Sequence, residues 1–330
     1  MVRSGWVNYS QGWQRWKPKL TIAAIIFGFM WAIFFPLLTT YEIGDMKIFL
    51  DAGAGRSLTG YYYAPWILPL IGFIDAIFPF KVASIILNCL SLSGYLYALH
   101  VFKGSKGLFF ISFPLLFALF YGQVDGIFMF GFALAYTSLR QDKVLPASIG
   151  LFIALCKWYI FAPFAFALWL LVATPKQRIQ LVGLLSLYLG ISLMVWWMWP
   201  LGIIERLRAV APITTLSVDL WDIVGPWCLL LWIPPLLSRT RDLRWWVMTW
   251  ALTTPYLHIH GLTHIMVFPL EGWGWWIQSG YVFSALWGPN NAYYLMLVPI
   301  AVYLLSWSRS WRTDLLGMWL ISRNTTKNGL

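Results

Sequence analysis

The stretch "TIAAIIFGFMWAIFFPLLTTYEIGDMKIFLDAGAGRSLTGYYYAPW", residues 21–66, decides the fold of this chain. Its first part, residues 21–39, carries no charged side chain and approaches the roughly 20 apolar residues that a helix needs to cross a hydrocarbon core. Charges gather directly after it, at Glu42, Asp45, Lys47, Asp51 and Arg56. This order predicts a transmembrane helix that leads into a polar loop beside the membrane.

Composition extends this prediction to the whole chain. Of the 330 residues, 60% are hydrophobic and 11% are charged, whereas soluble domains are about 45–50% apolar and about 25% charged. Backbone groups in lipid must be paired within the protein, so long apolar runs form helices there. We predict an all-α, polytopic transmembrane helical bundle, a single integral membrane domain over residues 1–330, with about 10–12 membrane helices.

Basic residues orient the predicted helices. The net charge of +11 would suggest nucleic acid as a partner of a soluble protein, but here Lys and Arg occupy short loops, where they favour the cytoplasmic side. No basic stripe interleaved with aromatic residues indicates a nucleic-acid partner. The basic N-terminus and the alternation of loops place both termini in the cytoplasm. Residues 41–80 and 200–225 then form two outer loops, the first with proline-rich interfacial helices.

This topology brings polar residues of several segments to the outer side. They are Asp45, Asp51, Gln123, Asp125, Lys157, Arg206, Arg208, Asp219, Asp222, His258 and His260. Ionisable groups inside a membrane bundle are costly and mark functional sites, so polar groups at one depth on several helices predict one shared cavity.

Four patches resemble a known family of membrane enzymes. "GDMKIFLDAGAGRSLTGYYYAPWILPL", residues 44–70, is similar to the first outer loop of GT-C glycosyltransferases, and in particular resembles that loop of GPI mannosyltransferase I. "YGQVDGIF" and "SIGLFIALCKWYIFAPF" are similar to glycosyltransferase family 87, and "TPYLHIHGLTHIMVFPL" is similar to a later segment of that family. The chain departs from these patterns in two places. It keeps one acid, Asp45, where GPI mannosyltransferase I has Asp-x-Asp, and it has Gly261 where an Asp often follows the late His.

The resemblance implies an inverting transfer of mannose or another hexose from a polyprenyl-phosphate donor to a glycolipid, polysaccharide or protein acceptor, on the non-cytoplasmic face. It implies Asp45 as the base that takes the acceptor's proton. Cations hold the charge of a leaving phosphate, and the donor-phosphate candidates are Lys157, Arg206, Arg208 and His258. Candidates for contacts with the sugar or the acceptor are Gln123, Asp125, Tyr63 and Trp66. No metal and no cofactor is expected.

Each candidate also has a structural interpretation. Lys157 fits a lysine that extends its ammonium to the lipid headgroups, and Asp125 fits a cap of the following helix. Tyr63 and Trp66 fit an aromatic belt at the membrane interface. Asp51 turns away from Asp45 on a helix, which favours a structural pairing with Arg56.

Two other classes of protein remain open. A membrane transporter would carry charges near the midplane and broken helices, often in an internal repeat. A structural subunit of a membrane complex, including a GT-C-like protein without activity, would have the same helices and no transfer activity. Mutation of Asp45 distinguishes these classes, because only the enzyme has a transfer activity to lose.

Overall fold

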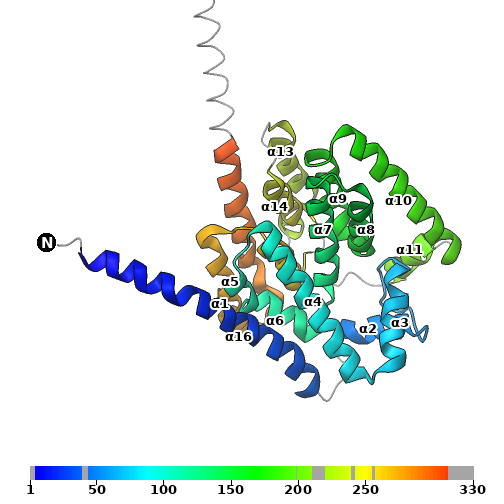
Figure 1. Cartoon of the computed structure of the whole chain (residues 1–330), viewed down its shortest axis with the longest axis horizontal. Helices are drawn as coiled ribbons and strands as arrows, with labels where there is room; N and C mark the ends of the chain where they lie inside the picture. The colour runs from blue at the N-terminus through cyan, green and yellow to red at the C-terminus, as the bar shows by residue number, and fades with distance from the viewer. Residues whose placement is uncertain are drawn as a thin grey trace, which may run out of the picture.

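The computed structural model describes residues 4–38, 44–197, 199–209, 220–238, 242–254 and 257–310. Within these ranges, side chains are described from residue 16 onward, except at 206–209, 222 and 289–292. All regular structure in the described ranges is helical, and no strand is found there (Figure 1). The predicted all-α fold class is therefore confirmed for this part of the chain.

Four helical stretches are long and apolar enough to cross a membrane. They are residues 16–38 of α1 (Ser4–Leu38), α4 (Phe80–Phe102), the stretch Val144–Leu171, and α10 (Pro175–Val195). A fifth results if α6 (Phe113–Tyr121) and α7 (Asp125–Arg140), which are bent by 119° at their junction, are counted as one span. These stretches indicate a polytopic membrane protein, as predicted.

The number of full-length spans differs from the prediction of about 10–12. In the described part of the chain, four or five stretches have the length of a span. Prolines and glycines divide other apolar runs into shorter pieces. Residues 65–77 form only η1 (Pro65–Ile67) and α3 (Leu68–Ile77), and residues 225–237 form η4 (Gly225–Trp232) and α13 (Ile233–Leu237). Residues 65–77 were predicted as an interfacial helix and 225–237 as a span, and both are shorter than the roughly 20 residues of a full crossing.

Residues 144–171 fold back on themselves at Lys157. The stretch consists of α8 (Val144–Ala154), η2 (Leu155–Lys157) and α9 (Trp158–Leu171). A straight helix of 28 residues would separate its ends by about 42 Å. Instead, the side-chain amide of Gln177, shortly after α9, donates to Leu139 O at 3.1 Å and to Asp142 at 2.8 Å, just before α8. The two ends therefore meet, so this stretch has the length of one span but consists of two shorter helices, α8 and α9, and the chain reverses at Lys157 as the sequence predicts.

Helix α7 lies at the centre of the bundle because glycines let its neighbours approach closely (Figure 1). A Cβ on Gly126 would lie 1.8 Å from Ser91 O of α4, and one on Gly131 would lie 2.5 Å from Gly150 O of α8. Small residues permit such backbone contact between membrane helices. Helices α1 and α10 lie on opposite sides of the bundle and expose apolar side chains, such as Met194 on α10, as helices that face lipid do.

Residues 44–80 form a pair of short, packed helices. Arg56 joins α2 (Gly44–Gly53) to α3 by donating to Asp51 at 2.7 Å and to Asp75 at 2.6 Å. The predicted pairing of Asp51 with Arg56 is therefore confirmed. Helix α3 buries Ile71 and leaves 65% of Phe73 exposed, the exposure pattern of a short helix that lies along a membrane interface.

The remaining described elements are short. They are α5 (Lys106–Phe110), α11 (Trp199–Ala209), α12 (Trp221–Val224), α14 (Leu243–Thr253), η5 (Ile259–Gly261), α15 (Leu262–Met266), η6 (Glu271–Gln278), α16 (Ser279–Trp287), η7 (Pro289–Met296) and a helix over 297–310. The predicted outer loop 200–225 thus contains α11 and α12, and residues 210–219 lie outside the described part.

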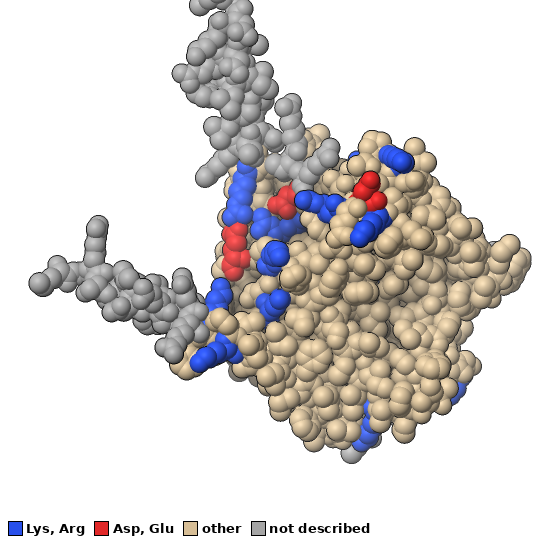
Figure 2. Space-filling model, viewed as in Figure 1, with Lys and Arg blue, Asp and Glu red and all other residues tan. Residues whose placement is uncertain are grey.

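Lys and Arg side chains gather at one end of the molecule, seen over the upper left of Figure 2. Arg140 ends α7 there, and Lys103 directly follows α4. Asp125 begins α7, whose 16 residues place it about 24 Å from Arg140. We call the region around Lys103 and Arg140 the basic end. Asp125 therefore lies at the opposite end of α7, and the assignment of the basic end to the cytoplasm stays a prediction.

Candidate functional site

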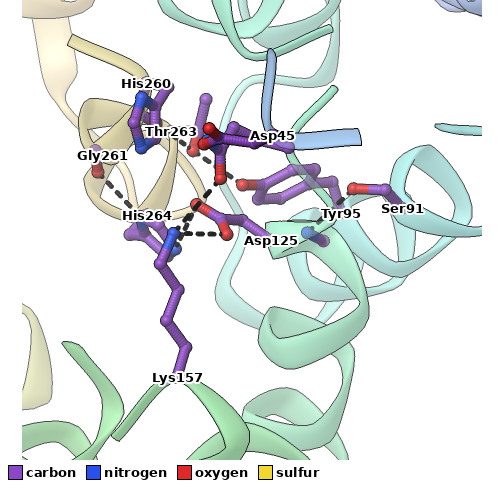
Figure 3. A network of polar contacts seen from close by, with 11 residues as sticks. Asp45, Ser91, Tyr95, Asp125, Lys157, His260, Gly261, Thr263 and His264 are labelled. Carbon is purple, nitrogen blue, oxygen red and sulfur yellow. Dashed lines mark hydrogen bonds and ion pairs between the residues drawn. The ribbon is translucent and has the colours of Figure 1, made fainter. Parts of the chain in front are cut away.

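Five polar residues from five different elements meet in one place (Figure 3). Asp45 comes from the first turn of α2, Gln123 from the turn between α6 and α7, and Asp125 from the start of α7. Lys157 comes from the reversal between α8 and α9, and His264 from α15. We call these five residues the polar cluster. It unites four residues that the sequence analysis expected on one side of the membrane.

The turn between α6 and α7 brings α2 into the cluster. Gly122 ends α6 with a φ of 70°, a left-handed conformation that glycine adopts without strain. A Cβ at this position would lie 2.4 Å from the Cβ of Met46 on α2. The next residue, Gln123, is buried and bridges two partners: its amide nitrogen donates to Asp45, and its amide oxygen accepts from Lys157 Nζ at 3.5 Å.

Asp125 and Lys157 form a buried ion pair. Their side chains approach to 2.6 Å between Nζ and Oδ1, and each is about 1% exposed. Two aromatic rings complete the surroundings of the ammonium, since Nζ lies 5.4 Å from the ring centre of Tyr63 and 5.7 Å from that of Tyr159. Because a lone buried charge is strongly unfavourable, loss of either partner of such a pair costs about 3–5 kcal/mol.

His264 presents an acceptor atom to Asp125. Its Nδ1 lies 2.8 Å from Gly261 O, and because a carbonyl can only accept, Nδ1 carries the hydrogen. Burial lowers the pKa of His264 to about 4, so the ring is neutral near pH 7 and Nε2 holds a lone pair. Nε2 lies 3.5 Å from Asp125 Oδ2, and neither atom has a hydrogen-bond partner in the described structure. His264 Nε2 and Asp125 Oδ2 are therefore two hydrogen-bond acceptors that face each other. A proton, or a donor group of a ligand, could bind between them.

Asp45 is the least buried residue of the polar cluster. It is partly buried, whereas the other cluster residues are almost fully buried. Burial raises the pKa of Asp45, and the nearby charge of Lys157 opposes this effect without cancelling it. Asp51 on the same helix behaves differently. Burial acts to raise the pKa of Asp51 as well, but Arg56 and Lys47 bind its carboxylate, and together they lower its pKa below the usual value.

Three further polar groups support the cluster and were not among the predicted site residues. Tyr95 on α4 shares a hydrogen bond of 2.7 Å with Thr263, the neighbour of His264, and the Ser91 hydroxyl accepts from the backbone N–H of Gly126 at 2.9 Å.

His264, a member of the cluster, was also not among the predicted site residues. The sequence signal that could have found it is its position as an ionisable residue inside the apolar run "GLTHIMVF". Tyr95 and Ser91 lie in an apolar helix with no comparable local signal.

The two aromatic residues predicted to contact the sugar are both in packed surroundings. Tyr63 is 7% exposed, and its ring stacks on Phe49 with centres 4.9 Å apart. Trp66 donates its indole N–H to Phe152 O at 2.8 Å and stacks on the Phe152 ring at 4.3 Å. The rings of Trp66 and Trp199 form a T-shaped contact with centres 5.4 Å apart. Tyr63 therefore belongs to the buried wall around Lys157, whereas Trp66 is partly buried and belongs to a separate aromatic group.

The remaining predicted phosphate contacts lie beside the cluster or outside the described side chains. The His258 ring stacks on His260 with centres 5.3 Å apart, and His260 lies near enough to Lys157 to feel its charge. Burial, reinforced by Lys157, lowers the pKa of His260 well below its usual range. Arg206 and Arg208 belong to α11, and their side chains are outside the described residues.

Comparisons with protein families, curated proteins and solved structures find no match to this chain. The site is therefore judged by its own chemistry. It offers a partly buried carboxylate, an amide that binds this carboxylate, and a buried acid, ammonium and imidazole beside them. Within the described residues, no group of three or more His, Cys, Asp or Glu side chains is arranged to hold a metal ion. Such a set is suited to moving or holding protons.

Proposed function

We propose that this protein is a membrane glycosyltransferase that moves mannose or another hexose from a polyprenyl-phosphate donor to an acceptor hydroxyl, with Asp45 as the base. The polar cluster carries this proposal. It joins a partly exposed carboxylate, Asp45, to the Gln123 amide and to the buried Asp125–Lys157 pair. Its position at the end of α7 away from the basic end suits a donor whose sugar sits at the surface of one leaflet.

In the proposed reaction, Asp45 removes the proton of the acceptor hydroxyl while that oxygen attacks the anomeric carbon of the sugar. The bond between this carbon and the phosphate oxygen breaks, and its electron pair leaves with the polyprenyl phosphate. The raised pKa of Asp45, caused by burial, makes the carboxylate a stronger base. Gln123 fixes the orientation of the carboxylate through its hydrogen bond.

The geometry changes the role that we propose for Lys157. Its ammonium is buried and is already bound by Asp125 and Gln123. A donor phosphate would have to displace Asp125 or share the ammonium with it. We therefore assign Lys157 to positioning Gln123 and balancing the charge of Asp125. Arg206, Arg208 and His258 remain the proposed contacts of the phosphate, whose developing charge needs positive groups or hydrogen-bond donors.

Transfer from defined donors tests this function. Purified full-length protein is incubated with radiolabelled polyprenyl-phosphate mannose or glucose and a membrane lipid extract, and the products are separated. We expect label in a new product with a polyprenyl-phosphate sugar and none with a nucleotide sugar. We also expect mass spectrometry to detect a polyprenyl-phosphate hexose among the co-purified lipids. Absence of both the transfer and the lipid contradicts the proposal.

One observation favours a transporter as a second candidate. The Asp125–Lys157 pair is buried beside His264 at the break between the bent helices α6 and α7. Buried ionisable groups at broken helices also form ion and substrate sites in transporters. In liposomes loaded with a pH-sensitive dye, a proton-coupled transporter would change the internal pH when its substrate is added. The proposed transferase would leave the internal pH unchanged.

A further inference from the structure

Two neighbouring cavities open at the basic end of the molecule. The first, of about 500 Å³, lies between the start of the α1 span, the end of α4 and the segment after α15. The second, of about 620 Å³, lies between the ends of α4, α7 and α9 and the start of α14. Both are lined by Lys103, Phe268 and Pro269, so they adjoin at Lys103. We call the two together the basic cavity.

Positive charge exceeds negative charge around the basic cavity. Its cations are Lys17, Lys103, Lys106, Arg140 and Arg244, and its carboxylates are Asp242 and Glu271. The carboxylates already pair with arginines, since Arg244 lies 3.4 Å from Asp242 and 3.6 Å from Glu271, and Arg309 also binds Glu271. The other four cations have no carboxylate within ion-pair distance in the described part of the chain. The cavity thus holds unbalanced positive charge.

Lys103 is held between the two cavities by a strained backbone. It caps α4 with a φ of 66°, a left-handed conformation in which glycine is the usual residue. A Cβ on the following Gly104 would lie 2.4 Å from Val267 O, so this loop packs tightly on the segment after α15. A lysine in a conformation that favours glycine is consistent with a role for its side chain, which lines both cavities.

The ends of two candidate spans lead us to expect the basic cavity at the depth of lipid headgroups. Lys17 lies at the start of the first span, and Lys103 directly follows the span of α4. Exposed tryptophans surround this end, with Trp16 at 57% and Trp275 at 62% exposure. Tryptophans of this kind mark the membrane interface. The walls of the cavity also include apolar side chains, among them Leu108 and Phe268, which suit the glycerol and upper acyl carbons of a lipid.

We infer that the basic cavity binds the phosphate headgroup of an anionic phospholipid, through Lys17, Lys103, Lys106 and Arg140. Basic pockets between membrane helices hold such headgroups by charge and by hydrogen bonds to the phosphate oxygens. This site lies at the other end of α7 from the polar cluster and does not depend on the proposed transferase activity. Its role is to anchor the ends of α1, α4 and α7 to one leaflet.

Native mass spectrometry of the full-length protein in detergent tests this inference with phosphatidylglycerol, phosphatidylcholine and inorganic phosphate as probes. We expect phosphatidylglycerol to bind and phosphatidylcholine to bind at least tenfold more weakly. Lys103→Gly removes the charge and also relieves the backbone strain, so its melting temperature should not fall. The variants Lys103→Gly and Arg140→Gln each remove one cation, and each should weaken phosphatidylglycerol binding about fivefold.

Lys143→Gln is the matched control, because Lys143 lies at the same end, outside the lining of the cavity, and bonds Gln141 at 3.0 Å. It should leave phosphatidylglycerol binding within twofold of wild type. Equal binding of the two lipids overturns the inference, as does an equal loss in Lys143→Gln and Lys103→Gly. Competition by millimolar inorganic phosphate that abolishes lipid binding would assign the cavity to free phosphate and would also overturn it.

Discussion

Asp125 holds the polar cluster together because each of its carboxylate oxygens faces a different element. Oδ1 binds Lys157 at the reversal between α8 and α9, and Oδ2 faces His264 on α15. The backbone of the next residue is fixed in turn by Ser91 on α4. A single side chain therefore connects segments that are far apart in the sequence. Its removal would leave the Lys157 charge buried without a partner.

His264 makes the stability of the protein sensitive to acid. Its folded-state pKa of about 4 lies below the ordinary 6.5. Between these two pH values the unfolded chain binds a proton at His264 and the folded protein does not. The stabilisation is complete above about pH 6.5 and is lost as pH falls towards 4, by up to about 3 kcal/mol. We expect the melting temperature of the purified protein to fall between pH 7 and pH 5.

His264→Asn tests this assignment. The asparagine amide can still donate to Gly261 O and has no charge to gain, so we expect a flatter dependence of melting temperature on pH than in wild type. The raised pKa of Asp45, caused by burial, acts in the opposite direction, but it is present in both proteins and cancels in the comparison. His100→Asn, at an exposed position, is the control. An unchanged pH dependence in His264→Asn would contradict this account.

At the residue scale, the sequence predicts the acids, the amide and the lysine of the cluster better than its histidine, and better than the packing of the aromatic residues expected at the site. Asp45, Gln123 and Lys157 stand out because polar residues at the ends of apolar runs must find partners. The orientation of a ring, by contrast, depends on tertiary packing. Tyr63 and Trp66 turn into protein, and no local pattern in "YYYAPW" distinguishes an open ring from a packed one.

At the scale of elements, close packing of α4 on α7 fixes the start of α7. A Cβ on Gly126 would lie 1.8 Å from a backbone carbonyl of α4, which cannot move aside as a flexible side chain would. We therefore expect Gly126→Ala to push the helices apart beside Asp125 and to destabilise the protein by about 1–3 kcal/mol. Thermal unfolding in detergent measures this change.

Gly183→Ala on α10 is the matched control, because nothing lies within 4 Å of its added Cβ. It should be neutral or slightly stabilising, since alanine favours a helix by about 1 kcal/mol over glycine. Equal melting temperatures for the two alanine variants would show that the α4–α7 contact is looser than described.

The elements also show which parts of the fold can be predicted locally. Lys157 is a charged residue within a long apolar run, and this charge predicts a turn there. The chain does reverse at Lys157, between α8 and α9. In the described part of the chain only four or five stretches have the length of a full span, and the number of membrane helices stays a prediction, because an apolar run such as 225–237 does not state whether it crosses the membrane. That outcome depends on how its short helices pack against other elements, which composition does not specify.

At the scale of the whole molecule, the two ends of α7 have different chemistry. One end carries the polar cluster with the partly buried Asp45, and the other carries the basic cavity. Helices α1 and α10 present apolar faces to their surroundings between these ends. In our proposal, a lipid-borne sugar reaches the cluster from one leaflet while anionic headgroups hold the protein in the other.

The sugar transfer rate of Asp45→Asn, compared with that of Asp51→Asn, tests the central claim most directly. Asparagine keeps an oxygen for Gln123 but cannot accept the acceptor's proton, so transfer should fall at least about 100-fold. The melting temperature should be unchanged or higher, because a neutral group is easier to bury. Asp51→Asn, on the same helix, breaks only its bonds to Lys47 and Arg56, and its transfer rate should stay within twofold of wild type. A folded Asp45→Asn protein that transfers sugar at the wild-type rate would contradict the account.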